Sequence, residues 1–226
     1  MKNYIFAGVV VFGVALFVWW FLSDYNSTGM PDSEPMDMSV PAQVIDTNSG
    51  TLTRSDMMDK KDEPIDRSAE RVTKKPFGIL VTPATSPVQP EKFSGYHTGV
   101  DFEVFEDEIN EFVNVKAICD GRVLAKEWVG GYGGVVVTSC LLDGEQVTVL
   151  YGHLNLESEG VNVWDQISAG DEVGTLGSAF SEQTDGERKH LHLGIHRGEM
   201  VVYTGYVDQE SKLSDWIDPC RLLCGE

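Results

Sequence analysis

Five histidines carry the most specific chemistry in this chain. His190 and His192 are separated by one residue in the run His-Leu-His-Leu-Gly-Ile-His, which predicts a strand. Side chains two apart on a strand point to the same face, so both imidazoles share one face, whereas Leu191, Leu193 and Ile195 point into a core. Such a face can offer two imidazoles to one metal ion, or one ligand and one acid–base group. Taken alone, the pattern also fits two surface histidines placed by chance.

His97 and Asp101 add an imidazole and a carboxylate four residues apart, with Gly99 between them. The glycine permits a bend that lets both side chains converge on one Zn²⁺ ion. A hydrogen-bonded Asp–His pair is the alternative. His153 follows a predicted strand in Tyr-Gly-His-Leu, a position typical of a surface residue when considered alone. His196 is expected to be a surface histidine at the end of its strand.

The elements that must position these side chains are predicted to be strands. From Pro76 onward, short runs rich in Val, Ile and Leu alternate with Gly and Asp turns such as 130–134 and 143–144. This pattern is typical of an antiparallel sheet domain, and it contains no long stretch with helical periodicity. We therefore predict one mainly β domain over 76–226, with one short helix in the last segment.

Six motifs in this order resemble the lysostaphin and LytM-type zinc metallopeptidases of bacterial cell walls. They are His-Thr-Gly-Val-Asp-Phe at 97–102, Val-Lys-Ala-Ile-Cys-Asp-Gly-Arg-Val at 115–123, Gly-Tyr-Gly-Gly at 131–134, Tyr-Gly-His-Leu at 151–154, Ser-Ala-Gly-Asp-Glu-Val-Gly-Thr-Leu-Gly at 168–177 and His-Leu-His-Leu at 190–193. The resemblance implies an antiparallel β domain of two packed sheets, with a zinc cleft across one of them. The Gly and Asp positions of the other motifs are interpreted as tight turns.

Carried over to this chain, the resemblance implies that His97, Asp101 and His192 hold Zn²⁺. His153 and His190 then lie beside the open coordination position, one as general base and the other steadying the oxyanion. Imidazole suits either role because it titrates near neutral pH. Which histidine takes which role stays open.

Two segments depart from the family pattern. The segment 178–189, before the His-x-His, is longer and more charged than in many relatives, and we expect it to form a wall of the cleft. The segment 103–111 is unusually acidic. We expect that it could favour a peptide bearing a free amine, and charge reversal at Glu106, Asp107 and Glu108 tests this.

The N-terminal part predicts a membrane anchor and a tether. Residues 4–22 contain no charged side chain, and about 20 apolar residues suffice to span a bilayer. We predict an anchor over 1–23 and a flexible acidic tether over 24–75. The chain is then expected to be a single-pass protein of the cell membrane, with its N-terminus in the cytoplasm and its catalytic domain outside. A cleaved signal peptide is the alternative, but its apolar core is usually shorter.

The net charge excludes one class of partner, and the cysteines indicate possible disulfides. The formal charge of −19 argues against nucleic-acid binding, which needs a basic surface. Four cysteines on the exported side permit disulfides. Cys119 and Cys140 lie nearly symmetrically about the 130–133 turn, and Cys220 and Cys224 could meet across one helical turn, but both pairings stay open.

Three functions compete at this point. The first is a zinc endopeptidase that cuts stem or cross-link peptides of peptidoglycan. The second is a non-catalytic LytM-like module that binds the wall or regulates a wall amidase or another envelope complex. The third is a peptidase acting on a protein substrate. Occupation of all five metal and catalytic positions favours an enzyme, although motif and fold do not prove turnover.

Overall fold

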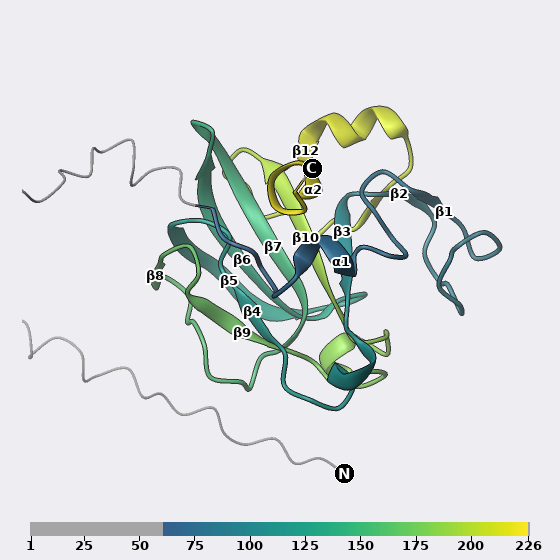
Figure 1. The fold of residues 1–226 in the computed structure, drawn as a ribbon. Helices are drawn as coiled ribbons and strands as arrows, with labels where there is room; N and C mark the ends of the chain where they lie inside the picture. Colours follow the sequence, from purple (N-terminus) through teal and green to yellow (C-terminus); the bar gives the residue numbers. More distant parts are fainter. Residues whose placement is uncertain (1–60, 226) are drawn as a thin grey trace, which may run out of the picture. The chain divides into compact units, whose positions relative to one another are not determined.

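The computed structural model describes residues 61–225, which form a mainly β domain (Figure 1). The strands are β1 (Leu80–Val81), β2 (Gly95–His97), β3 (Gly99–Glu103), β4 (Asn114–Lys116), β5 (Gly121–Val129), β6 (Gly133–Leu142), β7 (Glu145–Asn155), β8 (Gln166–Ile167), β9 (Glu172–Leu176), β10 (His190–Arg197), β11 (Tyr206–Val207) and β12 (Trp216–Ile217). The helices are α1 (Ser68–Arg71), α2 (Cys220–Leu223) and the 3-10 turns η1 (Glu106–Glu108), η2 (Glu182–Thr184) and η3 (Glu210–Asp215). The short helix expected near the C-terminus is α2.

The strands form two antiparallel sheets of unequal size. The larger has nine strands with the path β12-β10-β7-β6-β5-β8, onto which β3, β4 and β9 also pair, and the smaller contains β1, β2 and β11. Strand β10 pairs with β7 on one edge and with β3 and then β12 on the other (Figure 1). The prediction of a mainly antiparallel β domain is confirmed.

Strand β10 shows why the sequence pattern positions the histidines. Leu191, Leu193 and Ile195 are fully buried in the main hydrophobic core, as their alternation with polar residues predicts. Burial of each such side chain contributes about 1.5–3 kcal/mol to folding. The opposite face of the strand carries His190 and His192. The packing of the core therefore determines the direction in which both imidazoles point.

Residues 61–75 belong to the domain, which corrects the expected boundary between tether and domain at 75/76. Ile65 is buried in the main core, and the side chain of Arg71 is buried beside Glu108, with nitrogen–oxygen distances of 2.6 and 2.8 Å. Lys75 is also buried. The mixed charges of this segment suggested a solvated chain, whereas in the fold they pair with groups far along the sequence.

The predicted anchor over 1–23 and the tether up to residue 60 lie outside the described residues. Within 61–225, no helix combines the length and the apolar composition that a bilayer span requires.

Both open cysteine pairings are present as disulfides. Cys119, two residues before β5, bonds to Cys140 on β6, and Cys220 bonds to Cys224 within the last helical turn. The first bridge lies in the core, where both residues are buried.

Candidate metal centre and cleft

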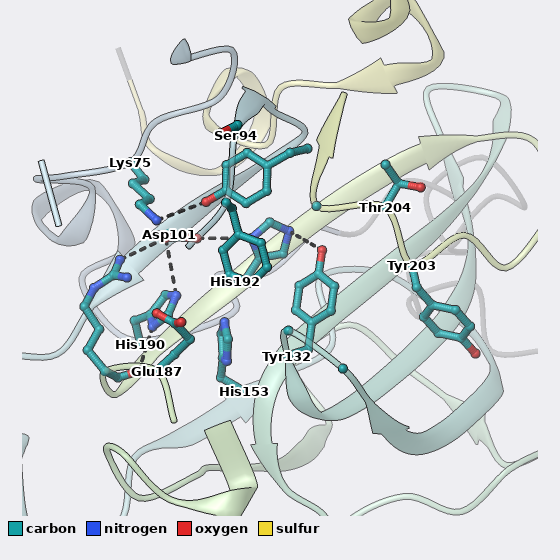
Figure 2. Close-up of a pocket in the computed structure, with 16 residues that line it drawn as sticks. Lys75, Ser94, Asp101, Tyr132, His153, Glu187, His190, His192, Tyr203 and Thr204 are labelled. Atoms are coloured by element: carbon teal, nitrogen blue, oxygen red, sulfur yellow. Dashed lines mark hydrogen bonds and ion pairs between the residues drawn. The ribbon is translucent and has the colours of Figure 1, made fainter. Parts of the chain in front are cut away.

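The face of β10 that carries His190 and His192 opens into a cleft of about 330 Å³ (Figure 2). Its lining includes Asp101, His153, His190 and His192, together with aromatic side chains and two cations: Phe93, Tyr132, Tyr203, Tyr206, Lys75 and Arg188. Glu187 and Arg188 come from the segment 178–189, which confirms that this segment contributes a wall of the cleft.

Strand pairing brings the metal-ligand candidates together. Asp101 on β3 lies directly opposite His192 on β10, and the turn from β2 to β3 places His97 beside them. Gly99 makes this approach possible, because a Cβ atom there would lie 2.4 Å from the carbonyl oxygen of Leu193 and 2.7 Å from Nε2 of His192. Any other residue at position 99 would push the two strands apart.

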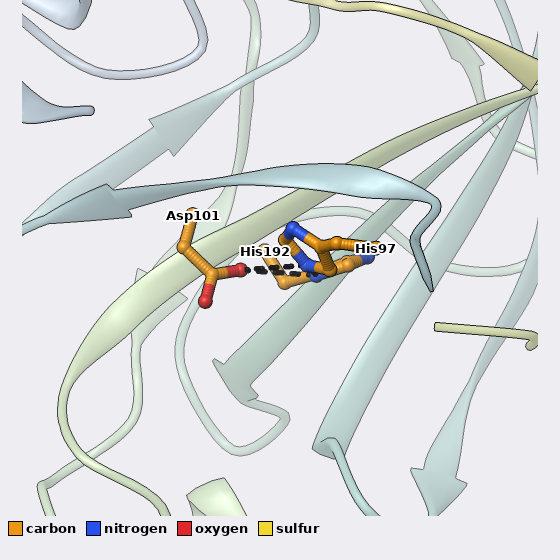
Figure 3. Close-up of side chains that lie close together, drawn as sticks. All are labelled: His97, Asp101 and His192. Atoms are coloured by element: carbon orange, nitrogen blue, oxygen red, sulfur yellow. Dashed lines mark hydrogen bonds and ion pairs between the residues drawn. The ribbon is translucent and has the colours of Figure 1, made fainter. Parts of the chain in front are cut away.

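Three donor atoms form a compact buried triangle (Figure 3). Nε2 of His97 lies 3.0 Å from Nδ1 of His192, and Oδ1 of Asp101 lies 3.1 Å from that Nδ1 and 3.3 Å from the His97 Nε2. In a tetrahedral zinc site with bonds of about 2.0–2.1 Å, ligand atoms lie roughly 3.3 Å apart. The triangle and its two imidazoles and one carboxylate therefore fit Zn²⁺.

Hydrogen bonds on the outer side of the rings support this interpretation. Nδ1 of His97 lies 3.2 Å from the carbonyl oxygen of Pro76, so this nitrogen carries the proton and Nε2 presents its lone pair. Nε2 of His192 lies 3.4 Å from the hydroxyl of Tyr132, to which it can donate, leaving Nδ1 as an acceptor (Figure 2). Three lone pairs then converge, an arrangement that a cation stabilises. Outer partners of this kind orient the ligands in known metal sites.

Asp101 is held as a carboxylate. Burial opposes its ionisation, but the neighbouring imidazoles of His190 and His97 outweigh that effect and keep the pKa of Asp101 well below its usual range. A buried carboxylate that remains charged is a good ligand for a divalent cation.

His153 and His190 lie together beside this triangle. Their ring centroids are 4.2 Å apart, and Nε2 of His190 lies 3.3 Å from Oδ2 of Asp101. Nδ1 of His190 lies 2.9 Å from the carbonyl oxygen of Arg188, which fixes the ring. Nδ1 of His153 is buried and has no hydrogen-bond partner. Burial, reinforced by the neighbouring His190, lowers the pKa of His153 well below its usual value, so this ring is neutral at neutral pH.

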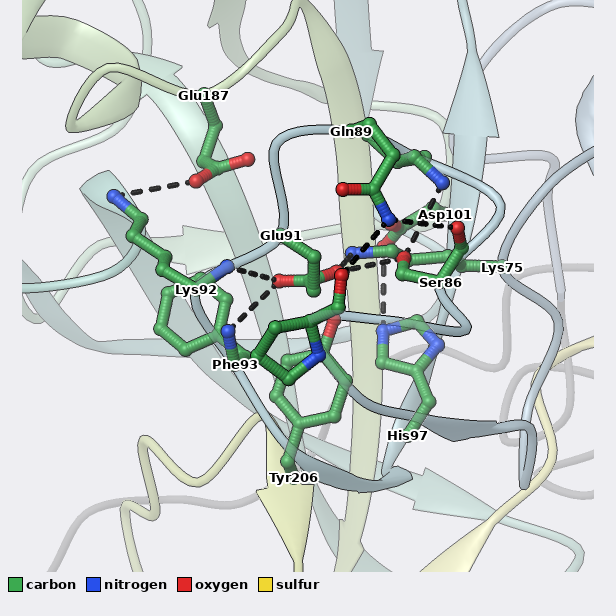
Figure 4. A network of polar contacts seen from close by, with 12 residues as sticks. Lys75, Ser86, Gln89, Glu91, Lys92, Phe93, His97, Asp101, Glu187 and Tyr206 are labelled. Atoms are coloured by element: carbon green, nitrogen blue, oxygen red, sulfur yellow. Dashed lines mark hydrogen bonds and ion pairs between the residues drawn. The ribbon is translucent and has the colours of Figure 1, made fainter.

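A buried ion pair supports the floor of the cleft (Figure 4). Nζ of Lys75 lies 2.6 Å from a carboxylate oxygen of Glu91 and 3.0 Å from the hydroxyl of Tyr206. The same carboxylate oxygen accepts a hydrogen bond from Ser86 at 2.9 Å. The carbonyl oxygen of Lys75 accepts a bond from the backbone amide of Asp101 at 3.0 Å, so the N-terminal segment is part of the site.

The acidic segment 103–111 and His196 both lie away from the cleft. No acid of the segment 103–111 lines the cleft: Glu103 binds Arg188 and Lys74, and Glu108 binds Arg71. Recruitment of an amine by these acids at the cleft is therefore not supported. His196 lies outside the cleft, partly buried, with its ring 4.8 Å edge-on from Trp216.

Sequence reasoning missed Lys75 and Arg188, and treated Tyr132 as part of a structural turn. Lys75 was assigned to the tether, and Arg188 was one of several charges in a segment that departs from the family pattern. The only available signal for Arg188 was its position two residues before the first histidine of the His-x-His.

Comparison with known proteins agrees with these motifs. Residues 95–204 match the model of peptidase family M23. The chain is 40% identical over 93 residues to the murein hydrolase activator EnvC of Escherichia coli (strain K12), a match covering 41% of this chain. The match spans about a fifth of that relative, 20% of its length.

Among the similar solved structures, one with a TM-score of 0.50 supports a shared fold. CbpA from L. salivarius REN is 23% identical, with a TM-score of 0.50 and coverage of 73% of this chain and 94% of that one. The catalytic domain of lysostaphin from Staphylococcus simulans is 21% identical, with a TM-score of 0.48 and coverage of 73% and 100%. The motifs in their order and the matched family model agree, and residues 95–204 form a domain similar to peptidase family M23.

Proposed function

We propose that the chain is a zinc-dependent endopeptidase that hydrolyses peptide bonds in stem or cross-link peptides of peptidoglycan and so remodels the cell wall. The observation that carries the proposal is the triangle formed by His97, Asp101 and His192, with His153 and His190 both facing the same cleft. All five positions that such a site requires are occupied by residues able to perform the role.

The division of labour follows from the contacts. Zn²⁺ bound by His97, Asp101 and His192 would supply Lewis-acid chemistry, activating water near neutral pH and polarising a carbonyl group. The carbonyl oxygen of Arg188 holds the Nδ1 proton of His190, so Nε2 of that ring, 3.3 Å from Oδ2 of Asp101, is the nitrogen that can take a proton and return it to the leaving amine. His153 lines the same cleft, where its imidazole can exchange a proton or hydrogen-bond the carbonyl oxygen of the substrate.

The aromatic walls of the cleft suit an extended peptide. Tyr132, Tyr203 and Tyr206 line it, and burial raises the pKa of Tyr132 and of Tyr206, which keeps both phenols neutral hydrogen-bonding groups. Nucleic acid is an unsuitable ligand for a chain with a formal charge of −19.

The second candidate function is a non-catalytic LytM-like module that regulates a wall hydrolase or another envelope protein. It is favoured by the 40% identity to a murein hydrolase activator. A module that only activates another enzyme has no need for a converging metal triangle with two further histidines. We therefore rank it second, and turnover is what separates the two.

The test is metal-dependent hydrolysis by the purified full chain. We expect about one zinc per chain, in keeping with a single three-ligand site, and release of peptides from purified peptidoglycan, detected by mass spectrometry as products with new amino termini. A chelator should stop release, and zinc should restore it. Stoichiometric zinc with no peptide release, while the chain increases hydrolysis by a purified wall amidase, would replace the enzyme by the regulator.

We further propose that the chain is a single-pass membrane protein with its N-terminus in the cytoplasm and its M23 domain outside. The uncharged run at 4–22 supports the anchor, and two disulfides support an oxidising compartment. On alkaline carbonate extraction, the full chain should stay in the membrane pellet, and a variant lacking 4–22 should not. Appearance of a shortened chain, lacking the run at 4–22, in the supernatant would argue for the cleaved signal peptide.

A further inference from the structure

Arg188 is a partly buried arginine between two carboxylates at the edge of the proposed metal site. Its side chain is 12% exposed. Nη2 donates to Oδ2 of Asp101 at 2.9 Å, and Nε lies 3.0 Å from each carboxylate oxygen of Glu103. Glu103 lies opposite His190 in the pairing of β3 with β10, and Lys74 contacts it at 3.1 Å. A guanidinium group held at both ends in this way has little freedom to move.

The two oxygens of Asp101 have different partners. Oδ1 lies within 3.3 Å of the inward nitrogens of His97 and His192, whereas Oδ2 faces Arg188 at 2.9 Å and Nε2 of His190 at 3.3 Å. An oxygen that already accepts a charge-assisted hydrogen bond is a poor second ligand for a metal ion. Arg188 therefore leaves Oδ1 as the one oxygen of Asp101 available for coordination.

The backbone of Arg188 orients the other half of the site. Its carbonyl oxygen lies 2.9 Å from Nδ1 of His190, and this hydrogen bond sets the tautomer of that ring. The side chain of Arg188 thus fixes the position of Asp101, a metal-ligand candidate, and its main chain fixes the ring of His190, an acid–base candidate. Replacing Arg188 by alanine removes the side-chain contact to Asp101 but keeps the contact to His190, because the carbonyl oxygen of the main chain remains.

We infer that Arg188 is a positioning residue that restricts Asp101 to coordination through one oxygen and so keeps a position on the metal open for water. The inference rests on the metal site of the proposed function. Without the guanidinium group, both oxygens of Asp101 could turn toward the ion, and two-oxygen coordination would fill the position that substrate hydrolysis requires. Outer partners of this kind change metal affinity by about 10–100-fold when they are removed.

The experiment compares the full chain with Arg188→Ala, Arg188→Lys and Arg197→Ala. Arg197 is a matched control because it is an arginine at the far end of β10, the strand that Arg188 precedes, and its side chain pairs with Glu145 at the surface, away from the cleft. Zinc affinity is measured by competition with a chromophoric chelator. The coordination number is read from the visible absorption of the Co²⁺-loaded protein, where four-coordinate sites absorb more strongly than five-coordinate sites.

We expect Arg188→Ala to bind zinc about 10–100-fold more weakly and to shift the Co²⁺ spectrum toward five-coordination. Arg188→Lys keeps the charge but not the fork that bridges both carboxylates, so its loss of affinity should be intermediate. Arg197→Ala should match the wild type. Circular dichroism checks folding, and Arg188→Lys decides the matter if the alanine variant does not fold.

Wild-type zinc affinity and a wild-type Co²⁺ spectrum in the Arg188 variants would overturn the inference and leave the proposed peptidase intact. Conversely, zinc binding by the wild type without any peptide release would overturn the peptidase and leave the role of Arg188 standing. The two failures are therefore distinguishable.

Discussion

Replacement of His192 by alanine should abolish stoichiometric zinc binding and reduce peptide release to background. His192 supplies one corner of the donor triangle, at 3.0 and 3.1 Å from the other two donor atoms, and alanine leaves only His97 and Asp101. Two ligands do not make a stable structural or catalytic zinc site. Zinc content by elemental analysis and hydrolysis by mass spectrometry are measured on the same preparation.

His153→Ala should separate metal binding from chemistry. His153 belongs to the cleft but not to the triangle, so this variant is expected to retain about one zinc per chain and to lose roughly 10²–10⁴-fold in rate. His196→Ala is the matched control, since His196 lies on the same strand as His192 and outside the cleft. Zinc retained by His192→Ala would show that the triangle is not the metal site.

Replacement of Lys75 by methionine should lower the free energy of unfolding by about 3–5 kcal/mol, the usual cost of removing one partner of a buried ion pair. The side chain of Lys75 is 3% exposed and that of Glu91 is 2% exposed. Methionine fills most of the space but leaves the Glu91 carboxylate without its cation. Urea unfolding of the full chain, followed by tryptophan fluorescence, measures the change.

A double variant and a pH series identify the cause. Lys75→Met with Glu91→Gln removes both charges, so it should be less destabilised than Lys75→Met alone. Burial opposes ionisation of Glu91, but its hydrogen bonds, above all from Lys75, more than offset this and lower its pKa. A depressed carboxyl pKa contributes stability that is present above the unfolded value of about 4.3 and is lost as the pH falls through the folded value.

The wild type should therefore lose this contribution below about pH 4.3. In Lys75→Met, burial is no longer offset by the lysine, so protonation of Glu91 becomes favourable and the difference from the wild type should shrink as the pH falls. A loss below about 1 kcal/mol, unchanged between neutral and acidic pH, would assign the effect to packing rather than to the ion pair.

The sequence predicted the face of β10 well because its signal is local. Leu191, Leu193 and Ile195 alternate with the histidines, and a period of two residues requires no knowledge of distant partners. The positions of His97 and Asp101 relative to that strand came from the family resemblance, and Figure 3 shows the three side chains converging in the described structure. Their roles in metal binding stay predictions.

The remaining contacts were not readable from local patterns because they join residues that are distant in the chain. Lys75 and Glu91 are 16 residues apart, Arg71 and Glu108 are 37 apart, and Arg188 and Asp101 are 87 apart. Composition counts such charges as solvated, whereas their burial depends on which opposite charge the fold brings near. The segment 61–75 was therefore placed outside the domain although it supplies part of the core.

The donor atoms come from distant parts of the chain, so the stability of the folded protein depends on how much metal is available to bind. His97 and His192 are 95 residues apart, so the triangle exists only after both sheets have formed, and an unfolded chain offers no comparable site. A metal ion present at 100 times its dissociation constant would add about 2.7 kcal/mol to the stability of the native state. Scarcity of zinc would then raise the unfolded fraction about 100-fold and expose the chain to proteases. The abundance of the protein would in this way follow the availability of its metal.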